Sequence, residues 1–172
     1  MDKTINFSGK LTIDKFNNIK NGTIAKRTQL NDLDDQFLSY NEQLKMLNKL
    51  FIDGECENDK LLKREIIKKI NSYKSQDIHK KIYNELLIIS LSDTLEKLVC
   101  SRLNCYYCKE HVLLFYKNVR DPKQWTLDRI NNDLCHSNEN TLISCMHCNL
   151  QRRTRDFNKF LFTKQLKITK EN

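Results

Sequence analysis

The chain contains little glycine and proline, with three Gly and one Pro among its 172 residues. Because flexible linkers are rich in such residues, we expect no long linker between separate domains. No stretch approaches the roughly 18 apolar residues of a membrane-spanning helix, and no apolar N-terminal run is typical of a secretion signal. We therefore expect an intracellular protein of the cytoplasm or nucleus that makes no contact with a membrane.

Hydrophobic residues make up 39% of the chain and charged residues 30%, which is typical of a folded protein. The net charge is +8, and a basic protein of this size commonly binds a polyanion such as nucleic acid. The basic charge is concentrated near the end, where Arg152 to Lys170 contains seven basic residues and one acidic residue. This tail is the predicted phosphate-contacting surface.

Residues 34–103 show the spacing of amphipathic helices, because apolar residues recur every three or four positions. The predicted helices are 34–52 with a stop at Asp53-Gly54, one that begins at Asn58 or Asp59, 75–91, and a short one opened by a capping box of Asp93 and Glu96. We expect them to form a small bundle that supports the rest of the chain. The alternative is a surface that binds a protein partner.

The pattern changes near residue 104, where short apolar or alternating runs predict strands. The predicted strands are 112–116, 125–130 and 141–144, followed by a helix from Met146 or Asn149 to Phe162. Residues 1–33 lack periodicity and are predicted to form an extended arm. The expected fold class is α+β, with the arm, a helical region over 34–103 and a compact module over 104–172.

Seven cysteines are an odd number for a disulfide framework, and in a reducing compartment cysteines more often bind metal. Two Cys-x-x-Cys pairs, Cys105 with Cys108 and Cys145 with Cys148, can each present two thiolates from one tight turn. Together they form the tetrahedral four-sulfur set that Zn²⁺ prefers, and such a closed site is structural. The alternative ligands are His111, His147 and Cys135.

The first cysteine pair is followed by a Leu-Asp-Arg-Ile run at residues 127–130, by Asn140, and by a Cys-x-x-Cys-Asn run at residues 145–149. This arrangement resembles the HNH endonucleases, and most closely the divergent branch with a Leu-Asp-Arg-Ile-Asp core found in phages and large DNA viruses. The resemblance covers about residues 105–162. It implies a zinc-stapled ββα-metal module that cleaves or nicks double-stranded DNA with Mg²⁺ or Mn²⁺.

The resemblance also implies roles for individual residues. Asp128 and Asn149 would bind the catalytic divalent ion, and Asn140 would brace the loop between the strands. Carboxylate and amide oxygens are ligands that suit Mg²⁺. The residues expected to contact nucleic acid are Arg129, Arg152, Arg153, Arg155 and Lys159.

The chain departs from the family pattern at two positions. Arg129 stands where the more familiar HNH sequence has the histidine that acts as general base, and arginine is not deprotonated in proteins. Asn131 stands where this branch has an aspartate. His136 is the nearest titratable replacement for the base. Asp133 is another candidate base or metal ligand.

Structural interpretations stand beside these catalytic ones. Asp128 alternatively forms a salt bridge with an arginine at the end of a strand, and His136 alternatively only bonds to its own turn. The arginine run alternatively forms a solvated helix face. At the level of the whole protein, the alternatives are a non-catalytic zinc module that binds nucleic acid in a transcription or processing assembly, and a small protein that its zinc site merely stabilises.

Overall fold

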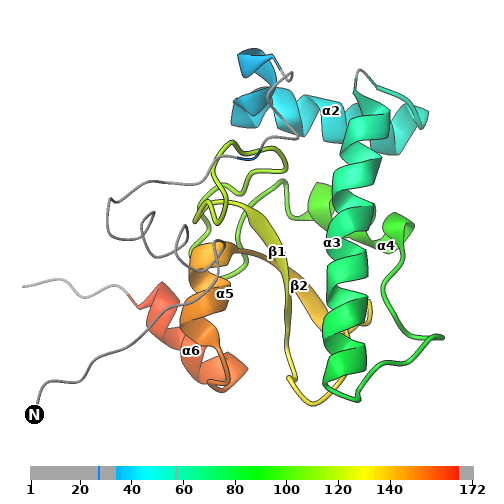
Figure 1. The fold of residues 1–172 in the computed structure, drawn as a ribbon. Helices are drawn as coiled ribbons and strands as arrows, with labels where there is room; N and C mark the ends of the chain where they lie inside the picture. The colour runs from blue at the N-terminus through cyan, green and yellow to red at the C-terminus, as the bar shows by residue number, and fades with distance from the viewer. Residues whose placement is uncertain (1–26, 28–33, 57, 167–172) are drawn as a thin grey trace, which may run out of the picture.

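The computed structural model describes residues 27, 34–56 and 58–166, and it combines helices with one small antiparallel sheet (Figure 1). The elements are η2 (Asp35–Leu38), α2 (Tyr40–Asp53), α3 (Asp59–His79), α4 (Leu91–Cys100), β1 (Trp125–Arg129), β2 (Thr141–Cys145), α5 (Met146–Arg152) and α6 (Phe157–Gln165). The predicted α+β class is confirmed. The predicted arm over 1–33 lies, apart from Arg27, outside the described residues. None of the helices in the described ranges is long and apolar enough to span a membrane.

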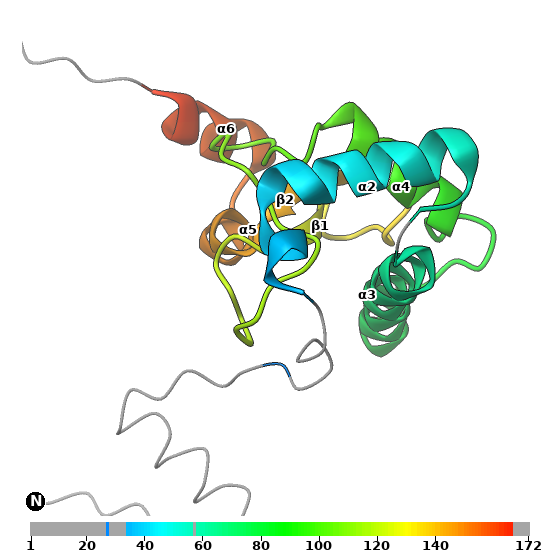
Figure 2. The same ribbon diagram turned by 90° about the horizontal axis from the view of Figure 1, so that it is seen from above.

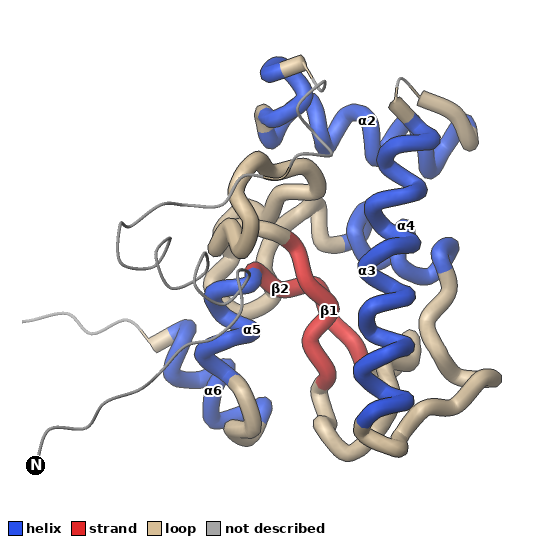
Figure 3. The backbone as a smooth tube through the Cα atoms, in the orientation of Figure 1, coloured by secondary structure: helices blue, strands red, loops and turns tan. Residues whose placement is uncertain are grey.

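Strands β1 and β2 form the two-stranded sheet at the positions that alternation predicted. They pair antiparallel, with Asp128 opposite Leu142. Figure 3 shows the strands between α3 on one side and α5 on the other. Nine of the ten strand residues are buried, the exception being the half-buried Thr126, so this small sheet is covered on both faces.

Helix α2 is capped at its N-terminus by Ser39, whose hydroxyl accepts a hydrogen bond from the Glu42 amide. It ends at Gly54, which has a φ of 73°, a left-handed conformation that glycine adopts without strain. The Asp53-Gly54 stop signal is thus confirmed. The preceding residues of the predicted 34–52 helix form the separate turn η2.

Helix α3 is a single helix of 21 residues, so the prediction of a separate helix over 75–91 was wrong. The chain leaves the helix after His79 and turns at Lys81, which has a φ of 59°. The apolar residues behind that prediction do not share a buried face. Leu86 is 92% exposed, whereas Ile89 is buried and its amide donates to the His136 carbonyl.

Helix α4 begins three residues earlier than predicted. Its capping box pairs Ser90 with Asp93, not Asp93 with Glu96. The Ser90 hydroxyl accepts from the Asp93 amide at 3.1 Å, and Asp93 accepts from the Ser90 amide at 3.0 Å. Each residue thus accepts a hydrogen bond from the other's amide, which would otherwise lack a partner, and this explains why α4 begins directly after Ser90.

The prediction of a strand over 112–116 is also wrong, because the backbone there forms hydrogen bonds with a side chain instead of with a neighbouring strand. Gln43 of α2 is fully buried, and its Oε1 accepts from the amides of Leu114 and Phe115. Its Nε2 donates to the Phe115 carbonyl at 3.0 Å. An isolated bridge between Leu113 and Gln124 is the remaining strand-like contact of this segment.

The predicted C-terminal helix is divided into α5 and α6. The break lies at Arg153, which has a φ of 50°, and α6 restarts with Asp156 as its N-cap. The Asp156 carboxylate accepts from the Lys159 amide at 2.9 Å. Helix α6 then brings Phe160 against the ring of Tyr107, with the ring centroids 4.9 Å apart.

One hydrophobic core joins the expected helical region and the expected module. Leu47 and Leu62 of the helices belong to the same buried cluster as Trp125 and Leu127 of β1. Figure 2 shows α3 on one side of β1 and α5 on the other, with α2 and α4 together over the sheet. The helices therefore form part of the walls around the sheet.

Candidate functional site

The four cysteines of the two Cys-x-x-Cys pairs come together in space. Their sulfur atoms all lie within 4.8 Å of one another, and three of the four residues are buried. This cluster could hold a metal ion such as zinc. His111 instead stacks on Tyr40, with ring centroids 3.7 Å apart, and neither it nor His147 nor Cys135 belongs to the cluster.

Local structure explains how two distant turns meet. Cys145 ends β2 and caps α5, since its sulfur accepts the Cys148 amide at 3.3 Å. The turn that carries Cys105 is tied to the same strand, because the Tyr106 amide donates to the Ile143 carbonyl at 2.9 Å. Contact with the sulfur of Cys105 raises the pKa of the Cys145 thiol to about 12. A metal ion would displace such protons when it binds.

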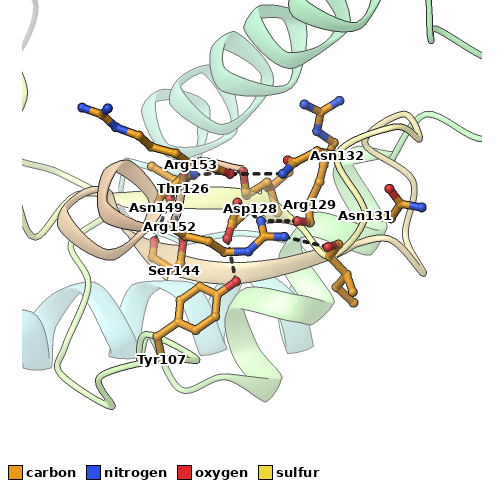
Figure 4. A network of polar contacts seen from close by, with 12 residues as sticks. Tyr107, Thr126, Asp128, Arg129, Asn131, Asn132, Ser144, Asn149, Arg152 and Arg153 are labelled. Carbon is orange, nitrogen blue, oxygen red and sulfur yellow. Dashed lines mark hydrogen bonds and ion pairs between the residues drawn. The ribbon is translucent and has the colours of Figure 1, made fainter. Parts of the chain in front are cut away.

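Asp128 lies on β1 with both carboxylate oxygens occupied (Figure 4). The Tyr107 hydroxyl donates to Oδ2 at 2.6 Å, and Nη1 of Arg152 donates to Oδ1 at 3.0 Å. Burial raises the pKa of Asp128, while hydrogen bonds from these two partners act to lower it. The predicted alternative, a salt bridge with an arginine, is therefore present. Each oxygen can still accept a second bond, because a carboxylate oxygen has two lone pairs.

Arg152 is buried, with 1% of its surface exposed, and it does not form part of the predicted surface clamp. Besides Asp128, its guanidinium donates to the carbonyls of Arg129 and Ile130. These carbonyls lie where β1 ends, so they need donors from outside the sheet. Arg152 supplies them, which accounts for its position inside the protein.

Arg129 is also buried and turned away from Asp128, as Figure 4 shows. Its Nη1 lies 3.4 Å from Oδ1 of Asp77 and donates to the Leu134 carbonyl at 3.1 Å. The predicted phosphate contact by Arg129 does not agree with this buried arrangement. Its charge instead compensates a buried carboxylate of α3.

His136 is buried in the loop between the strands and bonded to Asp77. Its Nδ1 lies 2.7 Å from Asp77 Oδ1, and its amide donates to Oδ2 at 2.7 Å. Its ring stacks on Tyr73, with centroids 4.6 Å apart. Burial lowers the pKa of His136, and the Asp77 carboxylate opposes that shift. The ring is therefore more than a loop histidine bonded to its own turn.

Asp77 is the residue of this site that sequence reasoning missed. It is fully buried on α3, 59 positions before His136. The signal was present in the chain, because Asp77 follows Ile66, Ile70 and Tyr73 on the buried face of one helix. A carboxylate on such a face needs a buried partner, and two of the candidate residues supply it.

The two candidate asparagines lie in the loop between the strands and on α5. Asn140 braces the loop, since its Oδ1 accepts the Asn131 amide and its Nδ2 donates to the carbonyls of Asn131 and Cys135, each at 2.9 Å. Asn149 lies on α5, and its Nδ2 donates to Thr126 Oγ1 at 3.1 Å. Its amide nitrogen is thus turned to β1, which leaves Oδ1 as the side-chain atom that could bind a cation.

The remaining candidates are exposed. Arg153 and Arg155 lie at the break between α5 and α6, and Lys159 lies on α6. Asp133 is exposed in the interstrand loop and does not line the cleft described next. The arginine run therefore divides into one buried residue and two exposed ones.

A cleft of about 460 Å³ brings three of the predicted catalytic residues together. Asp128, His136 and Asn149 line it, and the exposed Arg153 lies at its edge. Asp128 and Asn149 offer the oxygen ligands that suit a hard divalent cation, so the donor set fits Mg²⁺ or Mn²⁺. The cation would share the Asp128 carboxylate with Arg152.

Comparison with known proteins assigns the chain to no family. The cleft and the cysteine cluster are accordingly the grounds for a functional assignment. No protein-family model, curated protein or solved structure matches this chain.

Proposed function

We propose that the protein is a metal-dependent HNH-type endonuclease that cleaves or nicks DNA phosphodiester bonds, with structural zinc in its cysteine cluster. One observation carries this proposal: Asp128, His136 and Asn149 line one cleft, although they come from a strand, a loop and a helix. Arg153, Arg155 and Lys159, at the C-terminal helices, are exposed basic residues, as a nucleic-acid contact requires.

His136 is the general base in this proposal. A carboxylate accepts but does not donate, so Asp77 selects the tautomer in which Nδ1 carries the proton. Nε2 is then the nitrogen that accepts a proton from the attacking water. Burial lowers the pKa of His136, which favours the neutral ring that a general base requires.

Asp128 and Asn149 would hold the divalent ion, which would stabilise negative charge on the phosphate oxygens. Tyr107 and Arg152 orient the Asp128 carboxylate from two sides. Arg153, at the edge of the cleft, contacts the phosphate backbone. Arg129 has no chemical role and supports the base through Asp77.

The test measures nicking of plasmid DNA with Mg²⁺ or Mn²⁺ and with an EDTA control. His136→Ala should lower the rate by about 10²–10⁴, the contribution of a general base. Asp128→Asn should abolish nicking, because the amide keeps the shape of the side chain but loses its charge. The matched controls are Asp133→Asn and His111→Ala, which alter exposed residues outside the cleft and should leave the rate unchanged.

A second candidate function is a non-catalytic zinc module that binds nucleic acid. The observation that favours it is the pair of bonds from Tyr107 and Arg152, which occupy both oxygens of Asp128. This function predicts DNA binding that is independent of Mg²⁺ and no cleavage by the wild-type protein. Plasmid left intact under every metal condition, with DNA affinity retained, would decide for it.

A further inference from the structure

A second cleft adjoins the catalytic one. It has a volume of about 430 Å³ and shares four lining residues with the first. The shared residues are Tyr73, Gln76, Asn149 and Leu150. The two clefts therefore form one groove, whose lining residues include ones from α3, β1 and α5. Figures 1 and 2 show α3 and α5 on opposite sides of β1.

The wall on α3 is a polar stripe. The stripe consists of Lys68, Ser72 and Gln76 on α3 and of Lys80, the C-cap residue that directly follows the helix. These residues follow one another at four-residue intervals, so they lie along one face, and all four line the groove. The stripe covers twelve residue steps, or about 18 Å at the rise of an α-helix. Arg153, which caps the end of α5, also lines the groove.

The charge that the groove presents to solvent is positive. Its exposed charged side chains are Lys68, Lys80, Arg120 and Arg153. Among the described residues that line it, the two acids are buried and paired, Glu65 with Arg27 and Asp128 with Arg152. The groove is therefore complementary to a polyanion along its length.

Lys69 is a lysine of α3 that is not available to contact a phosphate. It is turned inward, donates to the Trp125 carbonyl, and lies 4.6 Å from the centroid of the Trp125 ring. Burial lowers the pKa of Lys69 to about 7. Lys80 differs because it is exposed in the cleft that contains His136 and Asp128.

We propose that this groove holds the backbone of a single nucleic-acid strand, and that Gln76 and Lys80 contact it together with Arg153. Clefts of about 430 and 460 Å³ are of the size that takes a small ligand, so they fit one strand and not the width of a duplex. The ~18 Å stripe matches about five nucleotides of a stacked strand, at about 3.4 Å each. This inference rests on the proposed function in one respect, which is the choice of the cleft that contains the reacting phosphate.

The test compares Lys80→Glu with Lys74→Glu, which makes the same charge change. Lys74 is exposed on α3, two positions from Gln76, so it lies on another face and lines neither cleft. Binding of a fluorescent single-stranded oligonucleotide is measured by anisotropy over a range of salt concentrations. Lys80→Glu should weaken binding and reduce the slope of log K against log salt by about 0.7, the value for one phosphate of a single strand. Lys74→Glu should leave the slope near that of wild type.

A second variant keeps the test independent of any loss of folding. Gln76→Lys adds a charge to the same stripe and should steepen the slope by about 0.7. Equal slopes for the three variants and wild type would overturn the groove assignment, as would an effect confined to duplex DNA. Plasmid left uncut by a protein that shows the expected slopes would instead reject the nuclease proposal and leave the groove standing.

Discussion

The hydroxyl of Tyr107 donates a 2.6 Å hydrogen bond to Oδ2 of Asp128. Tyr107 lies between Cys105 and Cys108 in the chain. The turn that supplies two sulfurs of the cluster therefore also positions the hydroxyl that donates to Asp128. Asn149 directly follows Cys148 on the other side of the cleft. The cysteine cluster therefore orders the cleft from two directions.

The first prediction concerns removal of the metal. Protein purified without added metal should contain about one zinc per chain, because four thiolates complete one tetrahedral site. Cys148→Ser should lose the zinc and the thermal transition of the sheet, since structural zinc contributes about 10–16 kcal/mol to folding in small peptides. Elemental analysis and circular dichroism measure both effects. Cys100→Ser, at an exposed cysteine outside the cluster, is the control and should retain both. A chelated protein that melts as before would contradict the prediction.

The second prediction concerns the bond between Tyr107 and Asp128. Tyr107→Phe should lower the free energy of unfolding by about 1.5–3 kcal/mol, the range for hydrogen bonds to charged groups. It should also raise the pKa of Asp128 further, because the bond from Tyr107 opposes the effect of burial. Urea unfolding measures the first effect. Tyr106→Phe is the control, since Tyr106 is 41% exposed. Equal losses of unfolding free energy in the two variants would show that the hydrogen bond from Tyr107 to Asp128 does not contribute to stability.

The third prediction concerns Arg152 and its neighbour. Arg152→Met should destabilise the protein by about 3–5 kcal/mol, because it leaves the buried Asp128 without its cation. Arg153→Met should change stability by less than about 0.5 kcal/mol, because Arg153 is exposed. Chemical denaturation of both variants provides the comparison. Similar stabilities for the two would refute the buried role of Arg152.

The fourth prediction concerns pH. Burial holds the pKa of His136 below its ordinary value, so the unfolded chain binds this proton more readily than the folded protein. The stability associated with His136 is therefore present above about pH 6.5 and is lost as the pH falls through the folded-state pKa. The charged groups that face the ring are Asp77, Arg129 and Lys80. Urea unfolding from neutral to acidic pH should show a loss in wild type that is smaller in His136→Asn. His111→Asn should behave as wild type.

The fifth prediction concerns the exposed arginines. Arg153 and Arg155 line a polar cleft at the break between α5 and α6. Replacing both with Ala should reduce the salt slope of duplex DNA binding by about 0.9 for each phosphate that the protein no longer neutralises. Arg102→Ala is the control, because Arg102 is exposed but follows α4. A slope unchanged by the double variant would exclude these residues from the interface.

Several features follow from the sequence alone, because short segments contain their causes. Alternating apolar residues predicted β1 and β2 at nearly their observed bounds, and Gly54 ended α2 as expected. The spacing of the two Cys-x-x-Cys pairs predicted a four-sulfur cluster, which is present. For the strands and for the end of α2, the deciding interactions lie within a few residues. For the cysteine cluster, the two Cys-x-x-Cys pairs themselves indicate which four sulfurs come together.

The tertiary structure decided what depended on distant partners. Gln43 bonds to the backbone of Leu114 and Phe115, so these residues do not form the predicted strand. The two arginines at positions 129 and 152 were predicted as surface contacts, but they became buried because Asp77 and the end of β1 needed compensating donors. A buried polar group must find a partner wherever the chain brings one, and the partner's place in the sequence is arbitrary. For that reason the pairing of Asp77 with a histidine 59 residues later could be recognised only in the fold.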